Sequence, residues 1–206
     1  MSKKIITLLL AGVMMLSLAA CGAKEAAPST PAATPSAPAA TETAGLTEAF
    51  AESPILVTSG GQSADYQMIA TVMGKVGMTY EVNNLATSAD LGDAKTLIVV
   101  VGGSSKGLGA AGIDADGELA RLAELIDGAK AAGLSIIAMH TGGEARRGDL
   151  SDKFITPIFE KADYAIVVTA GDEDGLMAGI CAGKGIPMDG IASISEVTTV
   201  LPAAFK

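Results

Sequence analysis

Three short stretches rich in glycine and hydroxyl side chains are the places in this sequence where ligand chemistry could occur. They span residues 58–63, 102–107 and 140–147, and each follows a run of apolar residues. Glycine lets the backbone approach a ligand closely, and hydroxyl groups both donate and accept hydrogen bonds. Backbone amides at the start of a helix favour an oxyanion. These residue types therefore favour a site for a carboxylate, a phosphate or a similar small anion.

The first stretch joins the apolar run 55–57 to a helical pattern that begins near Ala64. A strand that leads directly into a helix start leaves backbone N–H groups free to hold an anion. Alternatively, Ser59 and Gln62 form a capping box that satisfies the helix end, and the two interpretations are compatible. The spacing matches neither G-x-G-x-x-G nor a P-loop, so dinucleotide binding is not supported. The candidate ligand-binding residues here are Thr58, Ser59, Gly60, Gly61, Gln62 and Ser63.

The other two stretches add candidate residues of the same kind. From residues 102–107 we select Gly103, Ser104 and Ser105, although this stretch could equally be an exposed flexible loop. From residues 140–147 we select His140, Thr141 and Arg146, since Arg146 could grip a carboxylate through two nitrogens. A lone histidine is usually structural, but the expected position of His140 at a strand end makes a functional role equally plausible.

Catalysis has weaker support than binding. A Ser63, His140 and Asp172 set would be needed for an acyl-transfer triad, but Asp65 stands where a G-x-S-x-G elbow has its last glycine. Asp172 and its acidic neighbours could bind a metal together with Glu144 and His140, yet acidic residues more often cap a helix start. We therefore expect no catalytic residue, no metal and no cofactor.

The elements that must position these stretches alternate in type along the chain. Apolar runs predict strands at residues 55–58, 79–82, 96–101, 135–139 and 164–168, separated mostly by amphipathic helical patterns. Runs without polar alternation indicate strands covered on both faces. We predict an α/β fold, a single doubly wound (flavodoxin-like or Rossmann-like) three-layer sandwich. Its mostly parallel five-stranded sheet has the order 2-1-3-4-5, and the three stretches meet at the switch point.

The beginning of the chain has the pattern of an exported lipoprotein. Lys3 and Lys4 precede an apolar segment, residues 5–20, that is short for a membrane span. The segment ends in LAAC, which resembles the box before a lipid-modified cysteine, although an ordinary signal peptide with an incidental Cys21 is the alternative. We predict a lipoprotein signal peptide at residues 1–20, with Cys21 as the site of lipid attachment. A disordered tether rich in Ala, Pro and Thr completes residues 21–48, and one domain follows at 49–206.

Composition narrows the class of partner. The formal net charge is −9, aromatic residues make up 3% of the chain, and there is no tryptophan. An acidic chain without a basic run is a poor partner for nucleic acid. Few aromatic faces disfavour sugars and bases. Small polar ligands held by amides and hydroxyls are favoured instead.

The chain resembles a known but uncharacterised family. The segments PILVTSGGQSAD, from Pro54 to Asp65, and LIVVVGGSSKG, from Leu97 to Gly107, follow a lipobox and a short tether. This combination is similar to the exported bacterial proteins of domain-of-unknown-function family 6305, over about residues 53–205. The resemblance implies no established activity and no catalytic residues. It implies only that the glycine and hydroxyl loops belong to the pattern of the family.

Taken together, these patterns predict a membrane-anchored, extracytoplasmic binding protein for a small polar, anionic solute, with a transporter or another envelope protein as a possible partner. Two alternatives stay open: an extracytoplasmic hydrolase or transferase that uses His140, and an envelope protein-interaction module. A single lobe is unusual for a solute receptor, so the site would be shallow or completed by a second chain.

Overall fold

The computed structural model describes residues 44–206. The predicted signal peptide, Cys21 and most of the tether lie outside the described residues. Ala44 to Glu48, which we assigned to the tether, pack against the domain: the Ala44 carbonyl accepts a hydrogen bond from Met188, and Leu46 contacts the core. The packed region therefore begins before the expected boundary at residue 49.

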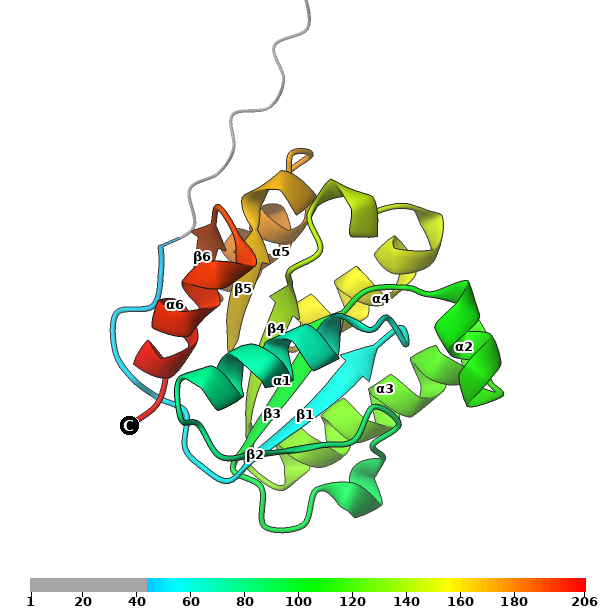
Figure 1. Ribbon diagram of the computed structural model, residues 1–206, viewed down its shortest axis with the longest axis horizontal. Helices are drawn as coiled ribbons and strands as arrows, with labels where there is room; N and C mark the ends of the chain where they lie inside the picture. Colours follow the sequence, from blue (N-terminus) through cyan, green and yellow to red (C-terminus); the bar gives the residue numbers. More distant parts are fainter. Residues whose placement is uncertain (1–43) are drawn as a thin grey trace, which may run out of the picture. The chain divides into compact units, whose positions relative to one another are not determined.

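The centre of the fold is a parallel sheet of six strands (Figure 1). Their order is β2-β1-β3-β4-β5-β6, and every neighbouring pair is parallel. The strands are β1 (Ile55–Gly60), β2 (Tyr80–Val82), β3 (Thr96–Val101), β4 (Ser135–His140), β5 (Tyr164–Val168) and β6 (Met188–Ile191). The predicted fold class and the order of the first five strands are confirmed, whereas the predicted strand count of five is wrong.

The unpredicted strand is β6, which pairs with β5 through Ala165 to Val168. Its four residues include Asp189 and Gly190, which are rare in strands, so its sequence shows no apolar run. An edge strand needs only one hydrogen-bonded neighbour, and β5 supplies it.

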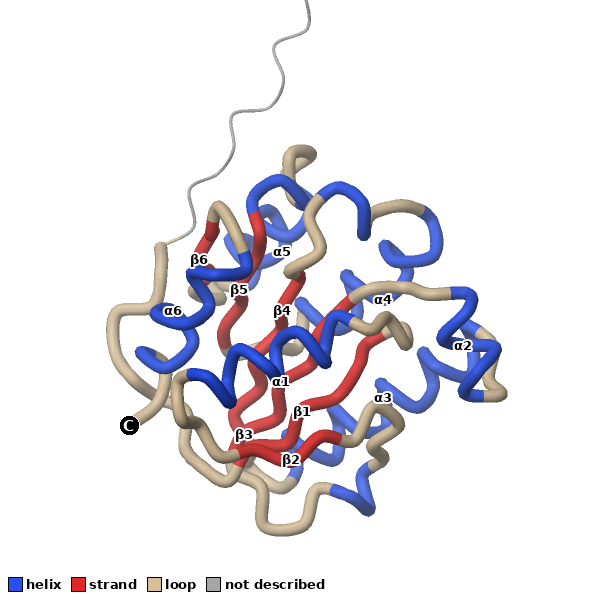
Figure 2. Tube along the Cα trace, viewed as in Figure 1, coloured by secondary structure: helices blue, strands red, loops and turns tan. Residues whose placement is uncertain are grey.

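Helices cover both faces of the sheet (Figure 2). On one face, α1 (Asp65–Lys75) lies beside α6 (Val197–Ala203). On the other, α3 (Ala115–Ala131), α4 (Asp149–Phe159) and α5 (Leu176–Lys184) lie in sequence, and the short α2 (Ser105–Ala111) follows β3. We expected a loop at residues 102–107, but Ser105 begins α2.

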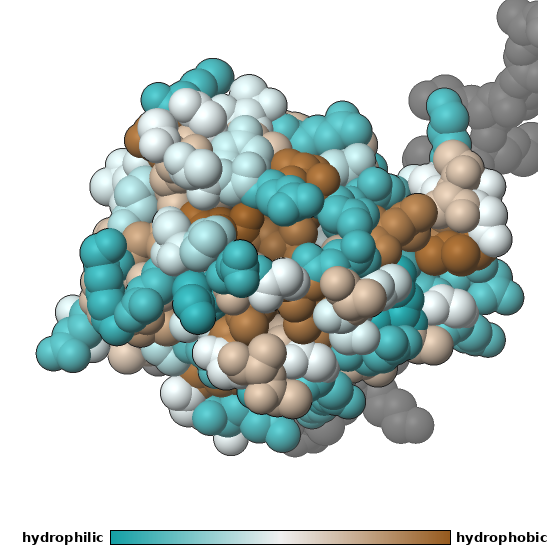
Figure 3. All heavy atoms as spheres, turned by 90° about the horizontal axis from the view of Figure 1, so that it is seen from below, coloured by the Kyte–Doolittle hydropathy of each residue, from teal (hydrophilic) through white to brown (hydrophobic). Residues whose placement is uncertain are grey.

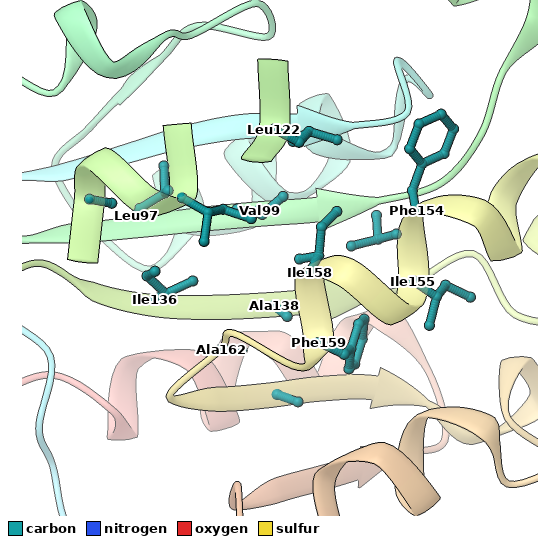
Figure 4. Close-up of a cluster of buried hydrophobic side chains, with 14 of the residues drawn as sticks. Leu97, Val99, Leu122, Ile136, Ala138, Phe154, Ile155, Ile158, Phe159 and Ala162 are labelled. Atoms are coloured by element: carbon teal, nitrogen blue, oxygen red, sulfur yellow. The ribbon is translucent and has the colours of Figure 1, made fainter. Parts of the chain in front are cut away.

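Alternate residues of the strands face two separate apolar clusters. Figure 4 shows the cluster under α3 and α4, where Phe154 and Ile158 pack near Val99 of β3. The cluster on the other face joins Ile69 and Met73 of α1 to the sheet. Both clusters and all six strands lie within residues 44–206, so this part of the chain holds a complete core and should fold on its own.

The strands place their carboxyl ends at one edge of the sheet and their amino ends at the other. Figure 3 views the amino end, where apolar surface is interrupted by polar groups. A hollow of about 320 Å³ lies near this end, lined by residues that include Ile55, Tyr80 and Leu91. Within residues 44–206, no helix combines the length and apolar character that crossing a membrane requires.

Candidate functional site

The glycine loop after β1 is held by a carboxylate of the protein itself. The N–H of Gly61 donates to Oε1 of Glu118 at 2.9 Å, and the Gln62 side-chain amide donates to the same oxygen at 3.1 Å. Glu118 is fully buried in α3 and is paired with Arg121 at 2.7 Å. The Gly61 N–H is therefore occupied by a carboxylate of the protein, and the Ser63 and Asp65 N–H groups donate to the Gly102 carbonyl and to Ser63 Oγ.

The same network explains the backbone of the loop. Gly61 has φ of 108° and Gln62 has φ of 61°, a conformation that is uncommon for residues other than glycine. The Gln62 side chain also exchanges two hydrogen bonds with Asn84, one to its carbonyl and one from its side-chain amide. These bonds, together with those to Glu118, stabilise the unusual backbone at Gln62.

The capping-box alternative is wrong. Ala64 precedes α1, and no side chain caps this helix. Gln62 does not complete a capping box with Ser59, because its side-chain amide donates to the Asn84 carbonyl and to Glu118 instead. The Ser59 hydroxyl instead donates to the Ser63 carbonyl at 3.3 Å.

The three candidate residues in the loop after β3 have different surroundings. Ser104 caps α2, since its hydroxyl oxygen accepts a hydrogen bond from the N–H of Gly107 at 3.0 Å. Ser105 is exposed in the first turn of α2, and the Gly103 N–H donates to Ser151 at 2.9 Å.

Gly102, at the start of the same loop, borders the first loop: a Cβ there would lie 2.7 Å from Ser63 Oγ and 3.1 Å from Asp65 Oδ2. A larger residue at this position would therefore have to displace the Ser63 side chain.

His140, at the end of β4, is fully buried. Its Nε2 lies 3.3 Å from the Arg146 carbonyl oxygen, and its Nδ1 has no hydrogen-bond partner. Burial lowers the pKa of His140, and the bond to the Arg146 carbonyl opposes this only in part. The ring is therefore neutral near pH 7, with its proton assigned to Nε2 as the donor to Arg146. Two other buried hydroxyls, those of Thr58 and Thr141, also have no partner among the described residues.

Arg146 and Arg147 fasten the β4 loop in opposite directions. Nε of Arg146 donates to both oxygens of Asp65, at 3.0 and 3.2 Å, across to the start of α1. Arg147 bonds Asp152 and Asp174 and also the Gly171 carbonyl. The hydrogen bonds to Asp174 and Asp152 raise the pKa of Arg147. Arg147 is thus an ion-paired group and does not share the partner of Arg146.

The Arg146–Asp65 pair has one exposed member and one buried member. The Arg146 side chain is 42% exposed, whereas the Asp65 side chain is only 4% exposed. Among the described residues, neither terminal nitrogen of Arg146 has a hydrogen-bond partner, since Nε alone makes the bonds to Asp65. The side chain also lies against Gly142, where an added Cβ would overlap Arg146 Cγ.

The proposed catalytic triad is not assembled. Asp172 accepts hydrogen bonds from the N–H groups of Met177 and Ala178 and so caps the start of α5. Ser63 Oγ is 3.4 Å from the Asp65 N–H, and His140 contacts the Arg146 carbonyl. No hydrogen bond joins Ser63, His140 and Asp172 in the described part of the chain. Within residues 44–206, no group of three or more His, Cys, Asp or Glu residues is gathered to hold a metal ion.

Three loops therefore contribute to one polar cluster at the switch point. We call it the Asp65–Arg146 cluster; its members are Ser63, Asp65, Gly102 and Arg146. Asp65 and Gly102 were not among the sequence candidates. The acidic residue at the first position of α1 was a usable signal, because Arg146 needs a counter-ion if its side chain is to be held in place.

The fold and the cluster define a doubly wound α/β protein with a polar site at its switch point. The chain belongs to the family described as Domain of unknown function (DUF6305), which it matches over residues 52–205. No curated protein matches the chain.

Remote structural similarities extend over part of the chain. They include the psychrotrophic esterase EstA from Pseudoalteromonas sp., solved with monoethylphosphonate as inhibitor, at 12% identity and a TM-score of 0.33, covering 66% of this chain and 76% of the esterase. TesA shares 13% identity at a TM-score of 0.30, with 66% and 77% covered. A response regulator receiver domain protein from Clostridium thermocellum shares 16% identity at 0.32, with 66% and 98% covered. Similarities this distant carry no argument about the site.

The lowered pKa of His140 predicts a pH dependence of stability. The folded-state pKa lies below the unfolded value of about 6.5, so the unfolded state binds more protons as the pH falls through that value. The free energy of unfolding should therefore fall more steeply from about pH 7.5 to about pH 5 in the native protein than in His140→Gln. Glutamine keeps an N–H for the Arg146 carbonyl but does not titrate. Urea unfolding at several pH values measures both slopes, and equal slopes would contradict a buried, neutral His140.

Proposed function

We propose that this protein is a membrane-anchored, extracytoplasmic binding protein for a small polar, anionic solute, and that the solute binds at the Asp65–Arg146 cluster. The observation that carries this proposal is the state of Arg146. Its guanidinium is fixed through Nε by a buried carboxylate, while both terminal nitrogens are unused within residues 44–206 and the side chain is 42% exposed.

A guanidinium held in this way is suited to bind an oxyanion. The planar group can place two parallel N–H donors on a carboxylate or phosphate. The start of α1 lies beside the cluster, and its dipole favours negative charge there.

The residues around Arg146 suit a small ligand. Gly102 and Gly142 present backbone where a larger side chain would overlap Ser63, Asp65 or Arg146. The buried hydroxyl of Thr141, next to Gly142, has no partner in the described part of the chain. It offers one further donor or acceptor if the loop adjusts around a ligand.

Binding has more support than hydrolysis at this edge. His140 commits Nε2 to the Arg146 carbonyl, so a role as general base would require that bond to break or Nδ1 to become accessible. The interaction-module alternative is supported by exposed apolar side chains at Met68, Val76 and Val82, in α1, at its C-terminal cap and in β2. They lie outside the Asp65–Arg146 cluster, so the two functions are compatible.

Ligand-dependent stabilisation tests the proposed site. Residues 44–206 should gain thermal stability from at least one class among carboxylates, amino acids and phosphates, by about 2.7 kcal/mol at a concentration one hundred times Kd. Arg146→Gln, compared with its own ligand-free baseline, should lose this gain. Lys106→Gln, a change at an exposed cation on α2, should keep it. A full gain in Arg146→Gln, or none with any class in the native protein, would contradict the proposed site.

The proposed location rests on the first residues of the chain. A positive start, an apolar segment and the LAAC box precede Cys21, in the order that lipid attachment requires. In bacterial cells, Cys21→Ser should move the protein out of the membrane fraction and leave its stability unchanged. Membrane retention of Cys21→Ser would contradict lipid anchoring at this residue.

A further inference from the structure

We propose that the ligand of the Asp65–Arg146 cluster is a small zwitterion, with a carboxylate for Arg146 and an ammonium group for Asp65. An α-amino acid is the simplest molecule of this kind. This inference rests on the proposed function: it keeps a carboxylate at Arg146 and adds an ammonium group, because a solute with negative charge alone does not match the charges of the cluster.

Asp65 has unused hydrogen-bonding capacity. A carboxylate can accept several hydrogen bonds, and buried ones usually do. Both oxygens of Asp65 accept only the single Nε–H of Arg146 within residues 44–206, although the side chain is 4% exposed. An ammonium group carries three donors and would satisfy these oxygens more fully.

The charge of the cluster also disfavours a simple anion. Arg146 and Asp65 carry opposite charges 3.0 Å apart, so an anion attracted to the guanidinium is repelled by the neighbouring carboxylate. Within residues 44–206, no other cationic side chain is hydrogen-bonded or ion-paired to Asp65. His140 is neutral because burial lowers its pKa, and Arg147 is engaged by Asp152 and Asp174. Glu144, also on the β4 loop, is exposed and negative.

A zwitterion resolves this conflict by exchanging partners with the pair. Its ammonium would take the place of Nε at Asp65, and its carboxylate would accept from the terminal nitrogens of Arg146. The four charges then alternate in sign, and no net charge is added to the site. The exchange needs movement of the half-exposed Arg146 side chain, while Arg147 can keep the β4 loop fastened to α4 and to the segment before α5.

The test measures separately how much each charged group of the ligand contributes to affinity. Isothermal titration calorimetry on residues 44–206 would use the common L-α-amino acids, the N-acetyl and amide derivatives of each, acetate and phosphate. We expect at least one amino acid to bind about tenfold or more tightly than both of its derivatives, because each derivative lacks one charged partner.

Two other results would overturn the inference in different ways. If acetate, phosphate or an N-acetyl derivative binds as tightly as the amino acids, the zwitterion is wrong and the proposed anion site stands. If no compound binds at millimolar concentration, both the zwitterion and the proposed function lose their support.

The Asp65→Asn variant tests independently whether Asp65 recognises the ammonium group of the ligand. The variant should lose the preference for the amino acid over its N-acetyl derivative, since the group that discriminates them is gone. Asp152→Asn changes a carboxylate that, within residues 44–206, is paired only with Arg147 and the Gly148 N–H, and this variant should keep that preference. A preference that survives in folded Asp65→Asn would overturn the inference. If Asp65→Asn fails to fold, the derivative series on the native protein decides the question.

Discussion

The buried carboxylate of Glu118 is the group on which the geometry of the switch point depends. A charge that is removed from water must be paired and hydrogen-bonded, and Glu118 meets this requirement with Arg121, Gly61 and Gln62. Arg121 in turn donates to the carbonyls of Ser59 and Ala86. One ion pair in α3 thus fastens the end of β1 and the connection that follows β2. The rigid first loop then leaves Ser63 and Asp65 in a fixed place beside Gly102.

The β4 loop depends on a second, more exposed pair. Arg146 reaches across the sheet edge to Asp65, while Arg147 holds the same loop to α4 and to the segment before α5. The difference in burial between the two pairs separates their roles. Glu118 and Arg121 are enclosed and satisfied, as structural groups are, whereas Arg146 keeps donors free at the surface. A surface arginine with unused donors and a buried counter-ion is the feature that favours ligand binding here.

The sheet could be predicted from the sequence because its central strands are continuous apolar runs. Residues 96–101 and 164–168 contain little else, and a strand of this kind requires cover on both faces. The predicted order also placed β3 beside β1, as the structure shows. β6 was missed because Asp189 and Gly190 oppose strand formation locally. The α2 helix was missed because glycines 107 and 109 lower its helix propensity.

The candidate site was predictable only in outline. Topology located the three loops at one edge, since the carboxyl ends of parallel strands lie together. Topology could not show which polar and charged groups already have hydrogen-bond partners within the protein. Glu118 is 57 residues from the glycine N–H that it accepts from, and Arg146 is 81 residues from Asp65. Pairings over such distances are set by the packing of α3 and of the β4 loop, not by local residue patterns.

The central claim is that ligand binds at the Asp65–Arg146 cluster, and amide chemical-shift mapping tests it most directly. In a titration of isotope-labelled residues 44–206 with the common L-α-amino acids at millimolar concentration, the largest shifts should fall in residues 60–65, 102–105 and 140–148. Shifts concentrated instead around the hollow at the amino end, near Ile55, Tyr80 and Leu91, would contradict the claim.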